Sequence, residues 1–406
     1  MKKTPFLPGI LFICALAATA LARNSRSTSD NAYLGSLSFD LVVKHILVNV
    51  SVGNSRPLPF ILDTGDQLAI IDLDRAKQLG LTLQGDIQSG GAGAELLHGA
   101  YVQGSSFTIP GMNSFSQPLT LAFPLKNLEA PLGHEVYGVI GGDFIKEFVV
   151  EIDYPSHVVR LYDKDTFRYS GHGESIPIEM NADGHPVVEA KVTPEDGQAL
   201  EGKFLIDIGS SASLALYSPF VSAHNLPGPK LKTIRAMGAA GVGGEMQAQI
   251  GRVAELKIGD FSLSKPVTFF SQDKAGAFAS SSAQGNIGEQ ILSRFNLFLD
   301  YSHSRIILEP NKDYGHPFAP ADPGLVIEGV GSDFKTFRVL DVLENSPASD
   351  AGLRKGDVIT AVGDRPASSL SLNEITEMFE RGGTYSLDVR RGDTKLHVAL
   401  RPRRLI

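Results

Sequence analysis

The chain has 406 residues, a length that exceeds one ordinary hydrophobic core and indicates two or three domains. Its residues are 42% hydrophobic and 20% charged, a globular composition that excludes a disordered or fibrous protein. The formal net charge of −8 argues against a dedicated nucleic-acid-binding protein, so we expect no nucleic acid among its partners.

The N-terminal residues 1–22 have the pattern of an export signal. Lys2 and Lys3 precede an apolar stretch at 10–18, and small residues follow up to Ala22. A membrane-spanning helix needs roughly 20 apolar residues, so this stretch is too short to cross a membrane comfortably. We therefore expect signal cleavage, no stable membrane insertion afterwards, and a protein exported to the bacterial periplasm or secreted. A retained N-terminal anchor is the alternative.

Cys14 is the single cysteine and lies inside the expected signal. The mature protein would then have no thiol, which excludes a cysteine nucleophile, a thiolate metal site and disulfides. The ten histidines are scattered without a paired ligand spacing, so we expect no metal and no other cofactor.

Between residues 47 and 309 the sequence contains two copies of one unit. Phe60 to Gly65 aligns with Phe204 to Gly209 at an offset of 144 residues, and Glu151 to Tyr154 aligns with Phe298 to Tyr301 at an offset of 147. A near-constant offset over separate matches indicates a duplicated structural unit rather than a solenoid, whose repeats are much shorter.

Each copy is expected to be β-rich, because the chain has 42 glycines, 23 prolines and no tryptophan. Residues 48–52 alternate as a half-buried strand does, and 60–62 and 204–206 are short apolar runs typical of buried central strands. One modest helix per copy is expected, at residues 73–79 in the first and 287–295 in the second.

The domain boundaries follow from the ends of these patterns. The first lobe is expected to span residues 23–170 and the second lobe residues 171–310. Residues 311–323 are rich in proline and turn formers, which indicates a linker, and residues 324–406 suffice for one small domain.

The two Asp-x-Gly triplets are the strongest candidates for chemistry. In each, a buried apolar strand ends in a carboxylate, and the glycine two residues later allows a sharp turn. One such loop is a weak signal, but duplicated units pack about a pseudo-two-fold axis, where equivalent residues meet. Asp63 and Asp207 would then share one proton, one acting as general base on a water and the other as general acid.

These loops resemble those of the pepsin and retroviral-protease superfamily, over roughly residues 40–310. A second motif supports the resemblance, since Val139-Ile140-Gly141 and Asn286-Ile287-Gly288 match the apolar-apolar-Gly element, the latter with a polar first position. The resemblance implies a mainly β fold with two retropepsin-like β-barrel lobes related by a pseudo-two-fold axis. It also implies a catalytic pair, Asp63 and Asp207, with supporting residues Thr64, Gly65, Ile208, Gly209 and Ser210.

The sequence departs from this family at two positions. Ile208 replaces the usual Thr or Ser, so the hydrogen-bond network that braces the two loops should run through Thr64 alone. Asp66 replaces Ser or Ala, and its carboxylate is expected to point to solvent rather than to act in catalysis. These departures leave a second hypothesis open, a weak or inactive pseudo-protease that serves as a peptide-binding scaffold in the cell envelope.

Glycine-rich stretches follow both aspartate loops, where the family has β-hairpin flaps that close over substrate. Glycine permits close approach of the flap backbone to a peptide. A phosphate-cradling loop fits less well, because G-x-x-x-x-G-K-[ST] is not found here. The expected flap and substrate-binding residues are Gly90, Gly91, Gly93, Gly238, Gly241, Gly243 and Gly244.

Residues 324–406 resemble a small α+β PDZ domain. The match rests on Asn345-Ser346-Pro347-Ala348, Ala351-Gly352-Leu353 and Gly356-Asp357-Val358-Ile359, with a second helix expected from Ser371 to Arg381. The resemblance implies capture of an extended C-terminal peptide as an added strand. The expected ligand-binding residues are Gly331, Ser332, Asp333, Phe334 and Phe337. A structural cap on the protease is the alternative.

Taken together, these patterns predict an exported aspartic endopeptidase. Peptide or protein substrates are the expected partners of the aspartate pair, and a C-terminal peptide is the expected ligand of the PDZ domain. No cofactor is needed for hydrolysis by two carboxylates and a water.

Overall fold

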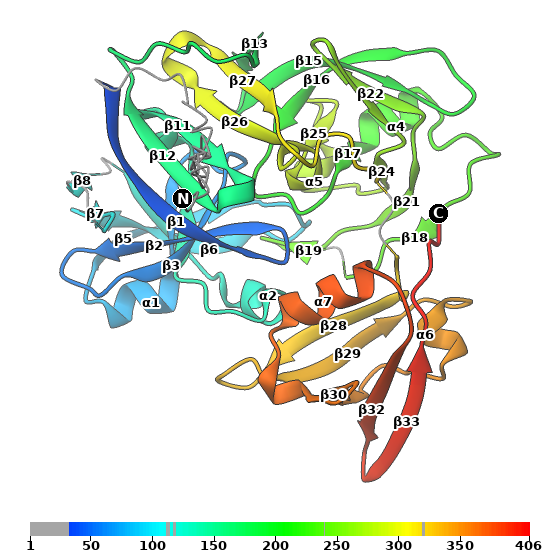
Figure 1. Cartoon of the computed structure of the whole chain (residues 1–406). Helices are drawn as coiled ribbons and strands as arrows, with labels where there is room; N and C mark the ends of the chain where they lie inside the picture. Colours follow the sequence, from blue (N-terminus) through cyan, green and yellow to red (C-terminus); the bar gives the residue numbers. More distant parts are fainter. Residues whose placement is uncertain (1–31, 111–113, 117–118, 239, 319–320) are drawn as a thin grey trace, which may run out of the picture.

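The computed structural model describes residues 32–110, 114–116, 119–238, 240–318 and 321–406 (Figure 1). The expected signal at 1–22, with Cys14, lies outside the described residues, as do residues 319 and 320 of the expected linker. Below, first lobe, second lobe and C-terminal domain denote the described parts of residues 23–170, 171–310 and 324–406. In the parts of the chain that the structure describes, no helix has the length and apolar character to cross a membrane.

The largest sheet has 15 strands and runs from the first lobe into the second. Its order is β13-β27-β26-β11-β12-β1-β2-β3-β10-β4-β9-β6-β5, with β7 paired to β2 and β8 to β7. The strands are β1 (Tyr33–Val42), β2 (His45–Val52), β3 (Leu58–Leu62), β4 (Ala69–Asp72), β5 (Thr82–Ser89), β6 (Leu97–Gln103), β7 (Ser106–Thr108), β8 (Ser114–Ser116), β9 (Thr120–Phe123), β10 (Gly138–Ile140), β11 (Phe148–Asp153), β12 (Val158–Asp163), β13 (Glu174–Pro177), β26 (Phe295–Asp300) and β27 (Arg305–Pro310).

A second sheet of 10 strands makes up most of the second lobe, in the order β18-β21-β24-β17-β25-β16-β15-β22-β23 with β14 paired to β15. Its strands are β14 (Glu179–Met180), β15 (Pro186–Thr193), β16 (Leu200–Ile206), β17 (Leu214–Leu216), β18 (Ile234–Arg235), β21 (Ala248–Arg252), β22 (Glu255–Ile258), β23 (Phe261–Ser264), β24 (Val267–Ser271) and β25 (Gly285–Ile287). A separate hairpin is formed by β19 (Ala240–Gly241) and β20 (Gly244–Glu245).

The mainly β class is confirmed, but the lobes are open sheets rather than closed barrels. Neither strand order returns to its own start among the described residues. The physical reason is that β11 pairs with β26 of the other lobe, which draws the first lobe's strands into a shared sheet.

The pairing of β11 with β26 places the pseudo-two-fold axis. These strands are antiparallel, with Glu151 opposite Phe298 and Val150 opposite Leu299. Glu151 and Phe298 are the residues that the sequence repeat aligns, so each copy meets its own counterpart at this point. One large hydrophobic core then extends through both lobes.

The α-helices of the described residues are short: α1 (Leu73–Gln78), α2 (Glu129–Leu132), α3 (Gly142–Ile145), α4 (Ser218–Ala223), α5 (Glu289–Leu292), α6 (Pro347–Asp350) and α7 (Leu372–Glu380). The expected helix at 73–79 is α1, which begins where the Asp72 side chain accepts hydrogen bonds from the amides of Asp74 and Arg75. The expected helix at 287–295 is wrong in extent. Ile287 ends β25 and Phe295 begins β26, which leaves one turn for α5.

The C-terminal domain has its own sheet and hydrophobic core. Its strands are β28 (Leu325–Val330), β29 (Thr336–Val342), β30 (Val358–Val362), β31 (Arg365–Pro366), β32 (Tyr385–Arg391) and β33 (Thr394–Leu400). The order β28-β29-β30-β32-β33 makes β28 an edge strand. The expected second helix is α7, and Ser371 and Glu374 form a capping box at its start.

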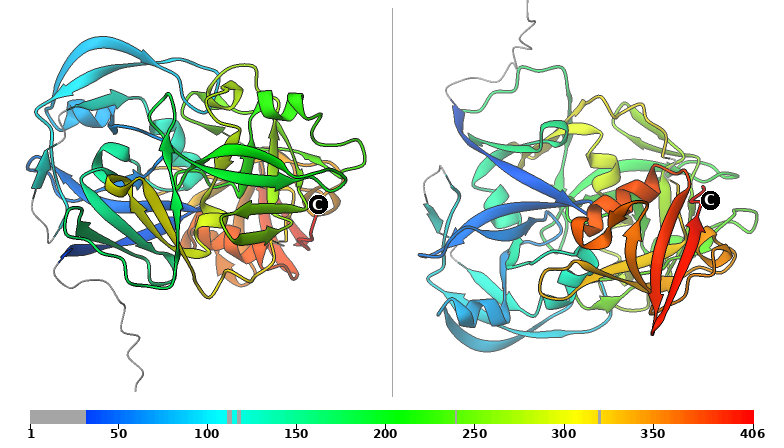
Figure 2. Two further views of the ribbon diagram at one scale, coloured as in Figure 1. Left: turned by 90° about the horizontal axis from the view of Figure 1, so that it is seen from above. Right: turned by 60° about the horizontal axis from the view of Figure 1, so that its bottom comes forward.

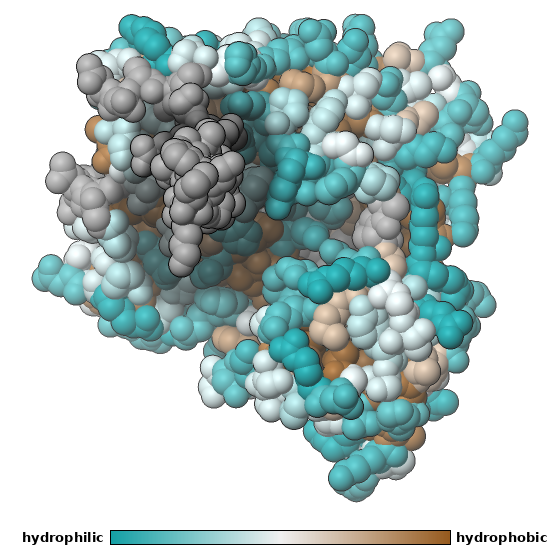
Figure 3. All heavy atoms as spheres, in the orientation of Figure 1, coloured by the Kyte–Doolittle hydropathy of each residue, from teal (hydrophilic) through white to brown (hydrophobic). Residues whose placement is uncertain are grey.

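The C-terminal domain sits against the two lobes with α7 turned toward them (Figures 1 and 2). The turn between β1 and β2 meets α7, because the Val43 amide donates to Oδ1 of Asn373 at 2.9 Å. On the face in Figure 3, the surface of this domain is largely hydrophilic, and hydrophobic residues show in a hollow between the lobes.

Candidate active site

Both aspartate loops are supported by the same strand arrangement. Asp63 follows β3, which pairs in parallel with β10, and Asp207 follows β16, which pairs in parallel with β25. The amide of Asp63 donates to the carbonyl of Ile140, and the amide of Asp207 to that of Ile287, each at 3.0 Å. The expected apolar-apolar-Gly elements are therefore the strands that hold the two loops in place.

The structure brings Asp63 and Asp207 together. A Cβ atom on Gly65 would lie 3.0 Å from Oδ1 of Asp63 and 3.1 Å from Oδ1 of Asp207, so both carboxyl groups face the same point. The amide of Gly65 donates to Oδ1 of Asp63 at 2.6 Å, and the amide of Gly209 donates to Oδ1 of Asp207 at 3.1 Å. A Cβ atom on Gly209 would lie 2.0 Å from Cγ of Asp63, so this position has room for glycine and for no larger residue.

The electrostatics of the two carboxyl groups differ. Burial, the charge of Asp207 and the charge of Asp66 raise the pKa of Asp63 well above its ordinary value. Burial also raises the pKa of Asp207, but hydrogen bonds from Asn286 and Gly209 oppose this rise. A pair of this kind holds one proton between two oxygens over a wide pH range.

Thr64 braces the loops across the axis. Its hydroxyl donates to the carbonyl of Ile206 at 2.5 Å and accepts from the amide of Ile208 at 3.0 Å, so it ties the first loop to the second. Ile208 is 0% exposed and packs in the shared hydrophobic core instead. The network thus reaches the second loop through Thr64, as the sequence predicts.

Asp66, which is expected to point to solvent rather than to act in catalysis, lies near the carboxyl groups of Asp207 and Asp143. It is partly exposed, and burial together with the charges of Asp207 and Asp143 raises its pKa to about 7. Its carbonyl accepts from the amide of Gly142 at 2.8 Å, which fixes the first loop against α3. The equivalent link in the second loop runs from the Glu289 amide to the Ser210 carbonyl, also at 2.8 Å.

Asn286 is the site residue whose role the sequence does not disclose. Its side-chain amide donates to Oδ2 of Asp207 at 2.6 Å. Asn286 is 2% exposed, and its Oδ1 has no hydrogen-bond partner among the described residues. The equivalent position on β10 is Val139, which is buried and apolar. The polar first position of the second motif is the sequence signal that points to Asn286.

The expected flaps meet each other. The loop between β5 and β6 lies against the turn of the β19–β20 hairpin, since the Gly93 amide donates to the Val242 carbonyl and the Glu95 amide to the Gly243 carbonyl, each at 2.9 Å. A Cβ atom on Gly93 would lie 2.1 Å from the Gly243 carbonyl oxygen. Glycine is thus required where the two loops touch.

The other expected flap glycines divide between this contact and its surroundings. A Cβ atom on Gly91 would clash with the Val242 carbonyl, whereas one on Gly90 would lie 3.7 Å from its nearest neighbour, Leu96. Gly241 and Gly244 belong to β19 and β20. Gly238 has φ +62° and packs against Val326 of the C-terminal domain rather than against the other flap.

The expected ligand residues of the C-terminal domain lie between two strands. Gly331, Ser332, Asp333 and Phe334 form the turn that joins β28 to β29. Phe337 is 0% exposed and packs in the hydrophobic core of the domain. Its side chain therefore does not face a ligand, in contrast to the expectation from the sequence. The first lobe covers part of edge strand β28.

The cover over β28 comes from α2 and the glycine that follows it. A Cβ atom on Gly329 would lie 3.0 Å from Cα of Gly133, and one on Gly133 would lie 2.7 Å from Cβ of Leu372 at the start of α7. Lys44 also forms an ion pair with Glu380 of α7, with 2.9 Å between Nζ and Oε2. Strand β28 and helix α7 are therefore docked onto the first lobe.

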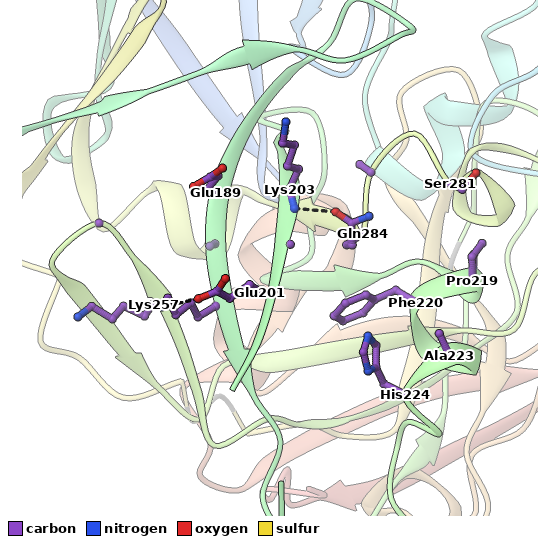
Figure 4. A pocket seen from close by; sticks show the side chains of 15 residues that line it. Glu189, Glu201, Lys203, Pro219, Phe220, Ala223, His224, Lys257, Ser281 and Gln284 are labelled. Carbon is purple, nitrogen blue, oxygen red and sulfur yellow. Dashed lines mark hydrogen bonds and ion pairs between the residues drawn. The ribbon is translucent and has the colours of Figure 1, made fainter. Parts of the chain in front are cut away.

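A pocket of about 970 Å³ lies on the second lobe, away from the aspartate pair. Figure 4 shows Glu189, Glu201 and Lys203 on its strand side, with Phe220 of α4 and His224, which follows α4, facing them. Oppositely charged side chains in this area already pair, as Lys191 does with Glu201 at 2.6 Å. In the described ranges, no group of three or more His, Cys, Asp or Glu side chains is arranged to hold a metal ion.

Comparison with known proteins gives two family matches. Residues 48–144 match the model of an aspartyl protease, and residues 313–401 match that of a PDZ domain. The serine protease HTRA1 of Xenopus laevis is 30% identical over 67 residues, which cover 16% of this chain and 14% of that protein. The chain therefore spans about a seventh of the length of this curated relative.

Three solved structures are similar to parts of the chain. The aspartic proteinase from Irpex lacteus is 12% identical, covers 70% of this chain and 98% of its own, and has a TM-score of 0.43. Basic 7S globulin from soybean is 9% identical, with 71% and 98% covered and a TM-score of 0.43. The HtrA3 PDZ domain bound to a phage-derived ligand (FGRWV) is 24% identical, with 20% and 85% covered and a TM-score of 0.19.

Proposed function

We propose that this chain, in which an aspartyl protease domain is joined to a PDZ domain, is an aspartic endopeptidase. The observation that carries the proposal is the close approach of Asp63 and Asp207, at the ends of equivalent strands of two lobes. The pair shares a proton because two adjacent carboxylates cannot both ionise readily. One carboxylate then activates a water and the other protonates the carbonyl oxygen of the scissile peptide bond.

The meeting of the two glycine-rich loops supports an extended polypeptide as substrate. Both loops offer backbone hydrogen-bonding groups at their contact, where Gly91 and Gly93 leave room for a close approach of the backbones. An extended peptide is recognised through such groups, as in the addition of a strand to a sheet. Opening of this contact would admit the substrate polypeptide to the aspartate pair.

The test is cleavage of a diverse peptide mixture across pH 3 to 8 by the wild type and by Asp63→Asn and Asp207→Asn. We expect wild-type cleavage and its loss in both variants. Asp183→Asn, at an exposed position of the second lobe, is the matched control and should cleave as the wild type does. Cleavage that survives both active-site substitutions would refute the proposal, and a wild type that binds peptides without cutting them would favour the scaffold hypothesis.

For the PDZ domain we propose binding of a C-terminal peptide along edge strand β28, because its unpaired backbone edge can accept another strand. The turn at 331–334 connects this strand to β29 and is not itself an edge. Docking on the first lobe competes with the peptide for the same strand. Fluorescence anisotropy with labelled FGRWV, the ligand bound to the HtrA3 PDZ domain, tests this. Val326→Asp on β28 should abolish binding, and equal binding by this variant would refute the site.

Export to the periplasm or secretion is also a proposal, which rests on the pattern at residues 1–22. N-terminal sequencing of the protein recovered from a bacterial envelope fraction tests it. We expect a mature chain that begins after Ala22. Recovery of the intact chain from the cytoplasm would contradict export.

A further inference from the structure

The two aspartate loops have the same backbone support but different side-chain support. Asp207 receives the Asn286 amide on Oδ2 at 2.6 Å and the Gly209 amide on Oδ1 at 3.1 Å. Asp63 receives the Gly65 amide on Oδ1 at 2.6 Å, and its counterpart of Asn286 is Val139, whose side chain can donate no hydrogen bond. The asymmetry lies in one residue on each supporting strand.

A buried amide donor stabilises the carboxylate anion more than the neutral acid. Asn286 is almost fully buried, so solvent does not weaken its bond to Asp207. On the other side, Asp63 has no such side-chain donor among the described residues, and the negative charge of Asp207 favours its protonated form. Both effects place the anion on Asp207 and the proton on Asp63.

We propose that Asn286 is a positioning residue that makes Asp207 the general base and Asp63 the general acid of the proposed peptidase. The inference rests on the proposed function for its catalytic meaning, but the location of the proton does not depend on turnover. It goes beyond the pairing of two aspartates, because it assigns each of them one task.

The hydrolysis balances with these roles. The oxygen of water forms a bond to the carbonyl carbon, its proton passes to Asp207, and the proton of Asp63 passes to the carbonyl oxygen to give a gem-diol. In the second step Asp207 gives its proton to the amide nitrogen and the C–N bond breaks. A hydroxyl proton of the diol returns to Asp63, which regenerates the starting state with a free acid and a free amine.

Other titratable groups near Asp207 do not supply the same bias. They are Asp63 and Asp66 of the first loop, His185 before β15, Tyr217 after β17 and Tyr301 after β26. His185 is the one basic group of these five, and burial lowers its pKa, which favours its neutral form. The Asn286 amide is therefore the neutral donor that sets the balance.

The experiment replaces Asn286 by Val, which occupies the equivalent position on β10, and by Leu, which has the shape of Asn without its donor. Loss of the donor destabilises the Asp207 anion, so the acid limb of the kcat/KM profile should move to higher pH. A hydrogen bond to a charged group corresponds to a shift of about one to two pH units. Asn296→Leu, which replaces a half-buried amide on β26 opposite Asp153, should leave the profile unchanged.

A second measurement needs no catalysis. In Asp63→Asn protein, infrared titration of the remaining active-site carboxylate reports Asp207 alone, by difference from Asp63→Asn/Asp207→Asn. Adding Asn286→Leu should raise its titration midpoint by about one to two pH units. An unchanged or lowered midpoint would overturn the inference. If the midpoint is raised but the wild type cleaves no peptide, the location of the proton is supported and only the proposed function is refuted.

Discussion

Thr64 and Ile208 hold equivalent positions in the two loops, yet one is hydrogen-bonded and the other hydrophobic. Thr64 makes two hydrogen bonds to the second loop. Ile208 has no side-chain hydroxyl, and its side chain is instead fully buried in the hydrophobic core. At the scale of single residues, each loop is thus held by a different force. Two predictions follow from this difference and from the third carboxylate beside the pair.

Replacement of Thr64 by Val should weaken the interface of the lobes. The substitution removes both hydrogen bonds and leaves the buried Ile206 carbonyl and Ile208 amide without their partner, which should lower the free energy of unfolding by about 2 kcal/mol. Urea unfolding measures the change. Thr64→Ser retains the hydroxyl and should recover most of the loss; equal destabilisation by Ser would show that methyl packing matters instead.

Asp66 should make stability depend on pH. Its pKa is raised to about 7 in the folded protein, above the ordinary value of 3.8, so the folded state binds the proton more tightly than the unfolded state. Stability should therefore fall as pH rises between these two values. Asp66→Asn is neutral throughout and should lose less stability over that window. Thermal unfolding of both proteins at several pH values between 4 and 7 measures this. An equal change of melting temperature with pH in the two proteins would contradict the role of Asp66.

At the scale of elements, the two glycine-rich loops form a contact through backbone hydrogen bonds, and the Val242 side chain packs against a hydrophobic cluster of the first lobe. Gly93 and Glu95 donate to carbonyls of the β19–β20 turn, at distances that leave no room for a side chain at Gly93. Sequence reasoning finds these loops because glycine clusters are visible. It cannot show that Gly93 lies in the contact while Gly90 lies beside it.

Gly93→Ala should separate the loops, because its Cβ atom would lie 2.1 Å from the Gly243 carbonyl oxygen. Hydrogen exchange of the amides of residue 93 and Glu95, which donate to the β19–β20 turn, should become faster, and peptide cleavage slower. Gly90→Ala is the matched control, since its Cβ atom meets only ordinary van der Waals contact at 3.7 Å. Equal protection in both variants would show that the contact is not maintained in solution.

The sequence predicts much of the site because both aspartate motifs are local and repeated. FILDTG-like segments carry their own strand, carboxylate and glycine, and the repeat makes them neighbours in space. The Asn286 bond to Asp207 depends instead on the register of β25 against β16, which is set by the whole sheet. The edge position of β28 is likewise a property of sheet order, so the turn that begins at Gly331 before β29 looks like a ligand loop in the sequence.

At the scale of the whole molecule, the C-terminal domain is joined to the lobes by several modest contacts. Val43 packs against its core and donates to Asn373, Lys44 pairs with Glu380, and Arg235 pairs with Asp341 at 3.0 Å. The side chains of Lys44 and Glu380 are 29% and 33% exposed, so this ion pair is only partly shielded. Contacts of this strength permit undocking.

Lys44→Glu should favour the undocked domain and so strengthen peptide binding. A partly exposed ion pair contributes about 0.2–1 kcal/mol, so its loss should increase the apparent affinity for the labelled peptide up to about fivefold. Anisotropy titration measures this, and Lys77→Glu, which breaks the exposed pair with Asp74, is the control. Unchanged affinity in Lys44→Glu would mean that docking and peptide binding do not compete.

The register that sets Glu151 opposite Phe298 has a consequence for how the two halves can evolve. In an assembly of two identical chains, every substitution beside the axis appears twice, so a change that suits one aspartate is forced on the other. Here one chain encodes both halves. Thr64 can face Ile208, and Asn286 can stand where the first half has Val139, without a compromise between them. Because both copies lie in one chain, the residues around each aspartate can change independently while the scaffold stays symmetric.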